Sequence, residues 1–254
     1  MEPAVCLLEF SSIAKGIEAG DAMAKRAPLQ VLRAGTVHPG KYLVLVGGLT
    51  ADVEESMEAG REIAGDALVD VVFLPDVHPD VVASIGGVRR EDDNEALGVI
   101  EAETVAATID AADAGVKGAR VTICDLRLAD DLGGKGYVLF SGEVAEVEAA
   151  VDYGVARTTV SGQAVTHVVI SQLHVEMREN LAAEPRFGER VRGMEKPTAA
   201  EIGLAGAGAP QRGRPLPGSG GGSRDVEEAR VSARPKPRSS RGARRAGRRR
   251  SKEE

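Results

Sequence analysis

The chain contains one small domain twice, and this internal repeat constrains its fold more than any other feature of the sequence. Residues 4–33 lie over residues 96–125 at an offset of 92, with nine of 30 positions identical. Residues 40–60 then lie over residues 134–154 at an offset of 94, with nine of 21 positions identical. A unit of about 85 residues is too long for a solenoid repeat and suits a small domain. The sequence therefore predicts two tandem domains with the same fold.

Each copy has hydrophobic and turn patterns typical of the order β-α-β-β-α-β. In the first copy we expect strands at residues 4–10, 29–34, 42–46 and 69–74. We expect a helix at residues 11–26 and a second helix that begins with Thr50 as its N-cap. This order predicts an α/β (α+β, ferredoxin-like) fold, with an open sheet and helices on one face.

Four segments follow from the repeat and from changes in composition. We place the first domain at residues 1–87, a charged linker at 88–95, the second domain at 96–181 and a tail at 182–254. The tail is rich in Gly, Pro and Arg and has no apolar periodicity, which predicts disorder. It carries a net charge of +9, from 18 Lys and Arg against 9 Asp and Glu, whereas residues 1–181 carry −16.

The composition argues against several classes of function. Aromatic residues make up 3% of the chain and Trp is absent, so few rings could stack on bases, which argues against base-stacking functions and a nucleic-acid partner. The Arg-rich tail leaves two alternatives open, because it could contact the phosphates of nucleic acid or the carboxylates of anionic cargo, or it could lie against the acidic body. Cys6 and Cys124 are far apart and without CxxC partners, which favours small core residues in a reducing cytosol. There is no signal-peptide pattern and no apolar run of 18 residues, so we expect no membrane contact. No Ser/His/Asp, HExxH, P-loop or GxGxxG arrangement indicates an enzyme.

Three short motifs occur in the same order in both copies. They are Leu8-Glu9, Asp21-Ala22-Met23-Ala24-Lys25 and His38-Pro39-Gly40-Lys41, and then Ile100-Glu101, Asp113-Ala114-Gly115-Val116-Lys117 and Leu132-Gly133-Gly134-Lys135. Over residues 4–181 this succession resembles the shell domain of bacterial microcompartments, the BMC domain. The resemblance implies a non-permuted tandem shell protein whose homotrimer is a pseudohexamer. It also implies a place in the microcompartment shell in the cytoplasm, with other shell proteins as partners.

In such a trimer the loop before each motif lysine converges on the central axis and lines a pore for small metabolites. The lining residues would be Val37, His38, Pro39, Gly40, Asp131, Leu132, Gly133 and Gly134. Glycine permits tight turns and leaves N–H groups free to meet an anion or a polar metabolite. Asp130 and Asp131 add negative charge that would select among charged solutes. The alternative reading is an ordinary Gly-containing hairpin turn.

His38 leaves a second function open. A trimer would gather three imidazoles at one axis, where they could titrate or hold a metal, and this predicts a metal-binding or electron-transfer pore as the alternative. The loop at residues 36–42 is similar to that of one tandem member of the family, in which a Cys in the place of His38 helps hold an iron-sulfur cluster on the three-fold axis, and that Cys is missing here. We therefore expect no cofactor, with a metal or cluster at His38 as the open alternative to a solvated loop histidine. A third reading is a ligand-sensing or enzymatic tandem protein with a site between its domains.

The remaining charged residues have structural interpretations. Lys25 and Lys117 can pair with Asp21 and Asp113 one helical turn away. The resemblance places both lysines at the tile edge, together with His78 and His174. Glu9 and Glu101 lie 92 residues apart on separate domains, which favours satisfied structural carboxylates over acid–base catalysis.

Overall fold

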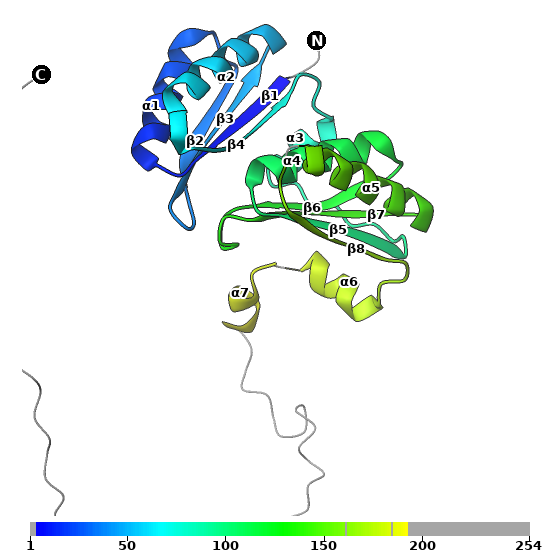
Figure 1. Cartoon of the computed structure of the whole chain (residues 1–254). Helices are drawn as coiled ribbons and strands as arrows, with labels where there is room; N and C mark the ends of the chain where they lie inside the picture. The colour runs from blue at the N-terminus through cyan, green and yellow to red at the C-terminus, as the bar shows by residue number, and fades with distance from the viewer. Residues whose placement is uncertain (1–3, 161, 184, 193–254) are drawn as a thin grey trace, which may run out of the picture. The chain divides into compact units, whose positions relative to one another are not determined.

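The computed structural model describes residues 4–160, 162–183 and 185–192, which form two α/β domains and a short extension (Figure 1). The first domain comprises β1 (Ala4–Phe10), α1 (Ile13–Arg26), β2 (Val31–Val37), β3 (Lys41–Gly48), α2 (Thr50–Ala64), the 3-10 turn η1 (Gly65–Ala67), β4 (Leu68–Leu74) and α3 (Pro79–Ile85). The second comprises β5 (Ala96–Ala102), α4 (Val105–Gly118), β6 (Thr122–Leu128), β7 (Gly136–Gly142), α5 (Val144–Val160), β8 (Val165–Ile170) and α6 (Val175–Ala182), and α7 (Phe187–Arg192) follows. The predicted order β-α-β-β-α-β is confirmed in both copies.

Both sheets are antiparallel and have the same topology. Their strand orders are β2-β3-β1-β4 and β6-β7-β5-β8. In β1, Cys6, Leu8 and Phe10 point toward α1 and α2, whereas Leu7 packs into a cluster shared with the second domain. Because β1 is buried on both faces, unlike the exposed edge strand β2, it is apolar along most of its length and does not alternate.

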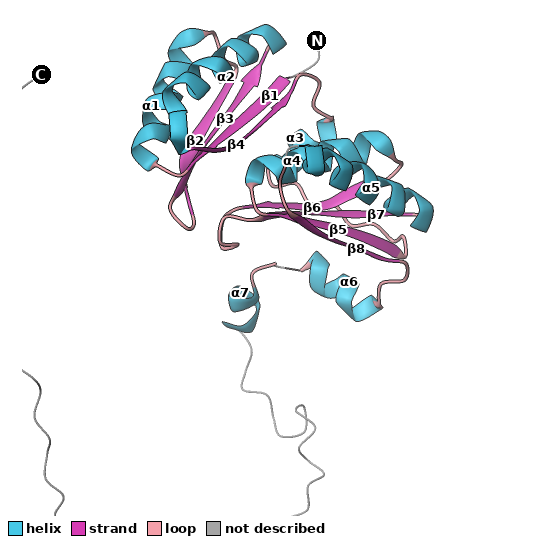
Figure 2. Cartoon of the chain, viewed as in Figure 1, coloured by secondary structure: helices cyan, strands magenta, loops and turns pink. Residues whose placement is uncertain are grey.

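The second sheet has helices on both faces. Helices α4 and α5 cover one face, and α6 and α7 lie on the opposite face (Figure 2). The α6 contact is held by Arg89, whose guanidinium donates to the carbonyl oxygens of Ala182 and Ala183. Arg178 of α6 in turn donates to the Asp92 carbonyl at 2.8 Å. The linker between the domains is thereby joined to α6 and the residue that follows it.

Side chains cap the N-termini of α1 and α4, whereas α2 lacks the side-chain cap that was expected. Ser12 and Thr104 are the N-caps of α1 and α4, and each side-chain oxygen accepts a hydrogen bond from the N–H three residues later. The expectation that Thr50 caps α2 is wrong, because α2 begins at Thr50 and Leu49 occupies the N-cap position. Thr50 Oγ1 instead donates to the Pro75 carbonyl oxygen at 3.2 Å. The hydroxyl therefore satisfies a carbonyl of the loop after β4.

Three features lie outside the predicted pattern. Helices α3 and α6 are only seven and eight residues long, too short to show a clear period. The linker is not simply exposed, because the N–H of Arg90 donates to the Cys124 carbonyl, beside the irregular pairing of β6 with β7. Ordered structure continues past residue 181 as α7, where Arg190 donates to the Asn180 carbonyl at 3.2 Å. The rest of the expected tail, residues 193–254, lies outside the described residues.

Candidate functional site

The two loops predicted to line a pore touch each other within one chain. The first joins β2 to β3 through His38, Pro39 and Gly40, and the second joins β6 to β7 through residues 129–135. A Cβ atom added to Gly134 would lie 3.0 Å from both the His38 carbonyl oxygen and Pro39 Cδ. Only a residue without a side chain permits this approach. The repeat therefore brings equivalent loops together.

The loop glycines serve the turns themselves. Gly40, Gly133 and Gly134 have φ angles of 108°, 66° and 88°, which L side chains rarely adopt. The N–H of Gly40 donates to the Val37 carbonyl at 2.9 Å, and the N–H of Gly134 donates to Ala129 at 3.4 Å. The expectation that these N–H groups are free to meet an anion is therefore wrong for Gly40 and Gly134, because hydrogen bonds within the turns use them.

Exposed charge at the loops comes from acidic side chains and not from the motif lysines. Asp130 and Asp131 are exposed, as is His38. Lys41 Nζ lies 2.6 Å from Glu9 Oε1, and Lys135 Nζ lies 2.8 Å from Glu101 Oε1. The hydrogen bonds that Lys135 donates to Glu101 and Glu103 raise the pKa of Lys135. Since both lysines are paired, the loops present net negative charge.

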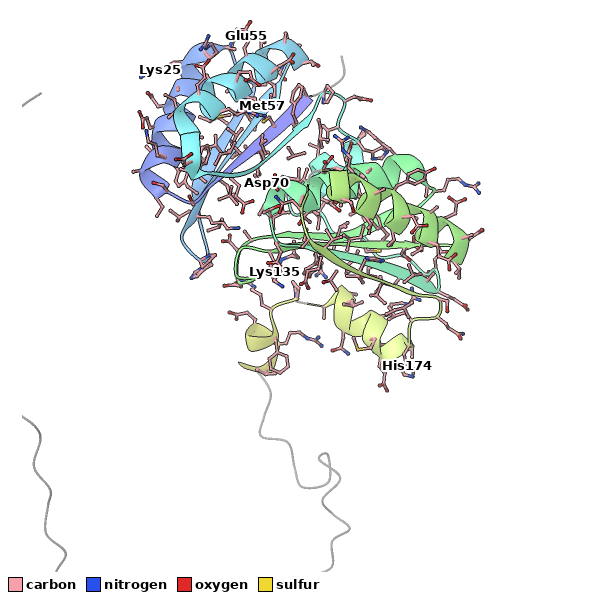
Figure 3. All side chains as sticks on the ribbon, in the orientation of Figure 1. Lys25, Glu55, Met57, Asp70, Lys135 and His174 are labelled. Atoms are coloured by element: carbon pink, nitrogen blue, oxygen red, sulfur yellow. The ribbon has the colours of Figure 1, made fainter. Side chains whose placement is uncertain are left out.

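A polar cluster joins the two domains behind these loops. Glu9 is fully buried on β1, and its Oε2 accepts a hydrogen bond from the N–H of Val105 at 2.9 Å, in the first turn of α4. The helix N-terminus is the positive end of the helix dipole and favours a carboxylate there. Beside it, Thr104 Oγ1 donates to Asp70 of β4 (Figure 3). Glu9 is therefore the satisfied structural carboxylate that the sequence predicts, and it acts between domains.

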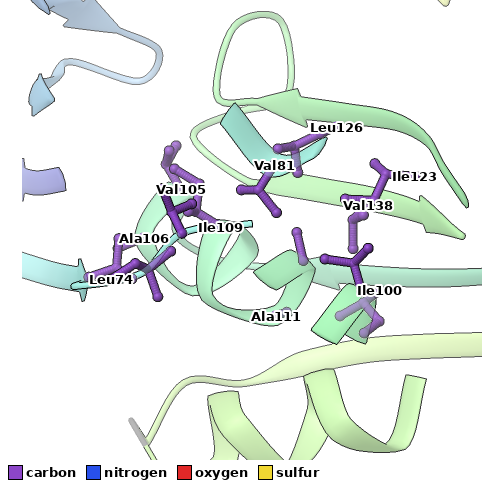
Figure 4. Packing of buried hydrophobic residues seen from close by; sticks show 14 of the residues in the cluster. Leu74, Val81, Ile100, Val105, Ala106, Ile109, Ala111, Ile123, Leu126 and Val138 are labelled. Atoms are coloured by element: carbon purple, nitrogen blue, oxygen red, sulfur yellow. The ribbon is translucent and has the colours of Figure 1, made fainter. Parts of the chain in front are cut away.

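Apolar side chains from both domains surround this polar cluster. They form one buried cluster in which β4 and α3 of the first domain meet α4 and β6 of the second (Figure 4). Its members include Leu7, Val72, Leu74, Val77, Val81, Val105, Ala106, Ile109, Ile123 and Leu126. Burial of these apolar side chains away from water stabilises the junction by the hydrophobic effect. The sequence reasoning missed these partners, because the repeat register matches equivalent residues of the two copies, whereas the junction joins β4 and α3 to the non-equivalent elements α4 and β6.

The four residues predicted at the tile edge divide into two pairs. Lys117 and His78 lie at the junction between the domains, where Lys117 Nζ donates to the Asp76 carbonyl and the His78 N–H donates to Asp113 at 2.8 Å. Their counterparts Lys25 and His174 are exposed (Figure 3). The predicted ion pairs are confirmed, at 2.6 Å from Lys25 to Asp21 and 2.7 Å from Lys117 to Asp113. A role at the tile edge stays a prediction.

The two histidines also act as helix caps, which the sequence reasoning did not anticipate. Nδ1 of His78 accepts a hydrogen bond from the Asp80 N–H at 3.2 Å, and Nδ1 of His174 accepts one from the Glu176 N–H at 3.3 Å. Each side chain therefore starts the short helix that follows β4 or β8. The identical spacing in both copies is the sequence signal that could have revealed these caps.

Neither cysteine is placed for nucleophilic or metal chemistry. Burial raises the pKa of the Cys6 thiol to about 12 and that of Cys124 to about 11, so both are protonated at neutral pH. Cys6 lies in the first core as expected, whereas Cys124 lines a cavity of about 240 Å³ beneath α6. The described part of the chain has no group of three His, Cys, Asp or Glu that could hold a metal ion. None of its helices is long and apolar enough to cross a membrane.

Comparison with known proteins identifies the repeated unit. Residues 4–77 and 96–173 each match the model of the BMC domain. The chain belongs to the BMC-domain family. It is 40% identical over 177 residues to the bacterial microcompartment shell protein PduT of Citrobacter freundii, which covers 70% of this chain and 96% of PduT. It is also 38% identical over 85 residues to the shell protein EutM of Salmonella typhimurium, which covers 34% of this chain and 86% of EutM.

A solved structure agrees with this assignment. A microcompartment protein from Desulfitobacterium hafniense DCB superimposes with a TM-score of 0.62 at 38% sequence identity, covering 70% of this chain and 99% of that protein. The tandem BMC fold predicted from the motifs is therefore confirmed. Both named relatives are microcompartment shell proteins, so this BMC-domain chain is a microcompartment shell protein with a structural role.

The junction between the BMC domains predicts an unequal response to loss of two carboxylates. Glu9→Ala leaves Lys41 largely buried without its partner, so we expect the free energy of unfolding to fall by about 3 kcal/mol. Glu62→Ala removes an exposed ion pair with Arg26, and we expect a change below about 1 kcal/mol. Urea unfolding followed by circular dichroism measures both. Equal losses would show that Glu9 does not hold the domains together.

Proposed function

We propose that this chain is a facet protein of a microcompartment shell. Its homotrimers would tile with other shell proteins and pass small metabolites through a central pore. The observation that supports this most directly is a pair of exposed apolar faces, one on each domain. Each face is the repeat counterpart of a face that is buried at the junction inside the chain.

The first exposed face lies on α1. Ile13 and Ile17 are 41% and 55% exposed, whereas their counterparts on α4, Val105 and Ile109, are fully buried against the first domain. The two pairs occupy equivalent positions at the offset of 92. The face of α1 therefore has the chemistry of an interface that the described residues of the single chain leave exposed.

The second exposed face lies on β8 and α6. Val168 is 46% exposed and Met177 is 51% exposed, whereas their counterparts Val72 and Val81 are 4% and 0% exposed. These pairs are related by the offset of 96. This face of the second domain is the natural partner for α1 of another copy, because Val72 and Val81 already bury α4 in the same way.

Two different complementary faces on one chain produce a head-to-tail contact, which closes into a ring when the rotation permits. The junction inside the chain supplies one domain-to-domain contact, and the proposed contact repeats it between chains. The number three comes from the resemblance to tandem shell proteins, in which six domains complete the ring. The two touching loops of each chain would then contribute to one axial opening.

We expect a single charge on α1 to prevent this assembly. Ile17→Glu places a carboxylate in the proposed interface but on an exposed position of the monomer, so the chain should fold and remain monomeric. Leu49→Glu is the matched control, because Leu49 is also exposed and its counterpart in the second copy is Glu143. Light scattering and electron microscopy should show trimers and sheets for the wild type and the control. A wild-type chain that stays monomeric at all concentrations would overturn the proposed function.

The exposed acidic residues predict the charge preference of the opening. Three copies would place six carboxylates from Asp130 and Asp131 near the axis, which favours cations and neutral solutes over anions. Asp131→Asn should lower the ratio of cation to anion conductance of trimers in a planar lipid bilayer. Asp152→Asn on α5, an exposed helix position, should leave that ratio unchanged. Equal ratios for Asp131→Asn and wild type would contradict a pore lined by this loop.

A metal-binding or electron-transfer pore at His38 is the second candidate. Its support is the exposure of His38 on a loop that touches the equivalent loop, so that a trimer would provide one imidazole from each chain. Metal analysis of purified trimers should then find about one ion per trimer, and His38→Ala should remove it. Wild-type trimers free of zinc and iron would leave the solute pore as the function.

A further inference from the structure

The start of α4 is satisfied by groups from both domains. Thr104 Oγ1 accepts a hydrogen bond from the Ala107 N–H at 3.2 Å, as an N-cap does. The Val105 N–H donates to Glu9 of the first domain at 2.9 Å. The carboxylate therefore meets the positive end of the helix from across the junction.

The start of α1 has the same cap but lacks the carboxylate. Ser12 Oγ accepts from the Lys15 N–H at 3.4 Å, which matches Thr104 and Ala107. Ile13 is the counterpart of Val105, and no acceptor among the described residues takes its N–H. Ile13 is also partly exposed. The first turn of α1 thus presents an unsatisfied donor on the apolar face described above.

The carboxylate missing from α1 has a counterpart on the second domain. Glu101 corresponds to Glu9, and its Oε1 binds Lys135 at 2.8 Å as Glu9 binds Lys41 at 2.6 Å. Glu9 is fully buried, whereas the side chain of Glu101 is 44% exposed. The structure shows no hydrogen-bond donor at Glu101 Oε2 within the described residues, the atom equivalent to the one that caps α4. Donor and acceptor are therefore each left open, on the two faces that the trimer brings together.

We infer that Glu101 of one copy accepts a hydrogen bond from the Ile13 N–H of the next copy and caps its α1. This inference rests on the proposed trimer and adds the polar contact that orients it. The apolar contacts of Ile13 and Ile17 are not directional, whereas a hydrogen bond from a helix N-terminus to a carboxylate is directional and charge-assisted. Glu101 is accordingly a positioning residue for a second copy of this chain.

A difference between the copies makes the contact between chains depend more on this glutamate. Inside the chain, Asp70 accepts a second polar bond from Thr104. The counterpart of Asp70 is Thr166, so the contact between chains has no carboxylate at that position. Of the two carboxylates that face α4 inside the chain, Glu9 and Asp70, only Glu9 has an acidic counterpart in the proposed contact between chains, and that counterpart is Glu101.

The test compares two glutamates that share one lysine. Glu101→Ala removes the proposed cap. Glu103→Ala is the matched control, because Glu103 is exposed, also binds Lys135 at 3.2 Å and corresponds to Ser11, whose hydroxyl donates to Ala67 of its own domain. In sedimentation equilibrium of the full chain, Glu101→Ala should weaken each interface about tenfold, typical of a charge-assisted bond. Since three interfaces close the ring, the monomer–trimer constant should fall about a thousandfold, and Glu103→Ala should leave it within about twofold.

Amide hydrogen exchange gives a readout that general destabilisation would not mimic. The Ile13 N–H should be protected in wild-type trimers and exchange freely in monomers and in Glu101→Ala, while the amides of the α1 interior keep their protection. Glu101→Gln keeps an acceptor without the charge and should restore part of the trimer. If wild type forms trimers and Glu101→Ala assembles equally well, the inference is overturned and the trimer stands. If wild type never forms trimers, the proposed function falls first.

Discussion

The carboxylate of Glu9 at the first turn of α4 is the contact on which the arrangement of the two domains depends. A fully buried charge is costly unless it is paired and hydrogen-bonded, and Glu9 meets this condition through Lys41 of its own domain and Val105 of the other. Its position requires α4 to begin where β1 of the first domain ends. The surrounding apolar cluster supplies the buried surface area that stabilises the junction. The hydrogen bond to the carboxylate fixes the orientation of α4 relative to β1.

The junction joins one face of each domain, and the repeat counterparts of both faces stay exposed. The face of α1 and the face of β8 with α6 repeat the chemistry of the buried junction, with Ile17 and Val168 exposed where Ile109 and Val72 are covered. A chain of this kind is expected to associate with itself, because the same physical reasons that join its domains apply at its ends. The touching loops lie beside the junction, where Lys41 at the end of the first loop binds Glu9. This arrangement fits the BMC-domain family.

Much of the fold followed from local pattern, and the failures have specific physical reasons. The apolar run of β1 and the spacing of α1 were predicted within two residues at each end. The short helices α3 and α6 were missed because His78 and His174 start them by capping, without a long apolar period. Thr50 was expected to be the N-cap of α2, but its hydroxyl donates instead to the Pro75 carbonyl, in a loop 25 residues further along the chain. The N–H groups of Gly40 and Gly134 were expected to be free, but the loops close on themselves.

The sequence by itself determined that the chain has two copies of a βαββαβ domain and which loops correspond, since both follow from residue identity at a constant offset. It also determined the i, i+4 ion pairs, because helical geometry alone brings Asp21 to Lys25. Only the tertiary structure decided that Glu9 is buried and Glu101 half-exposed, although the motifs around them are alike. The reason is that burial depends on which domain lies against each residue, and one chain provides that neighbour for the first copy only.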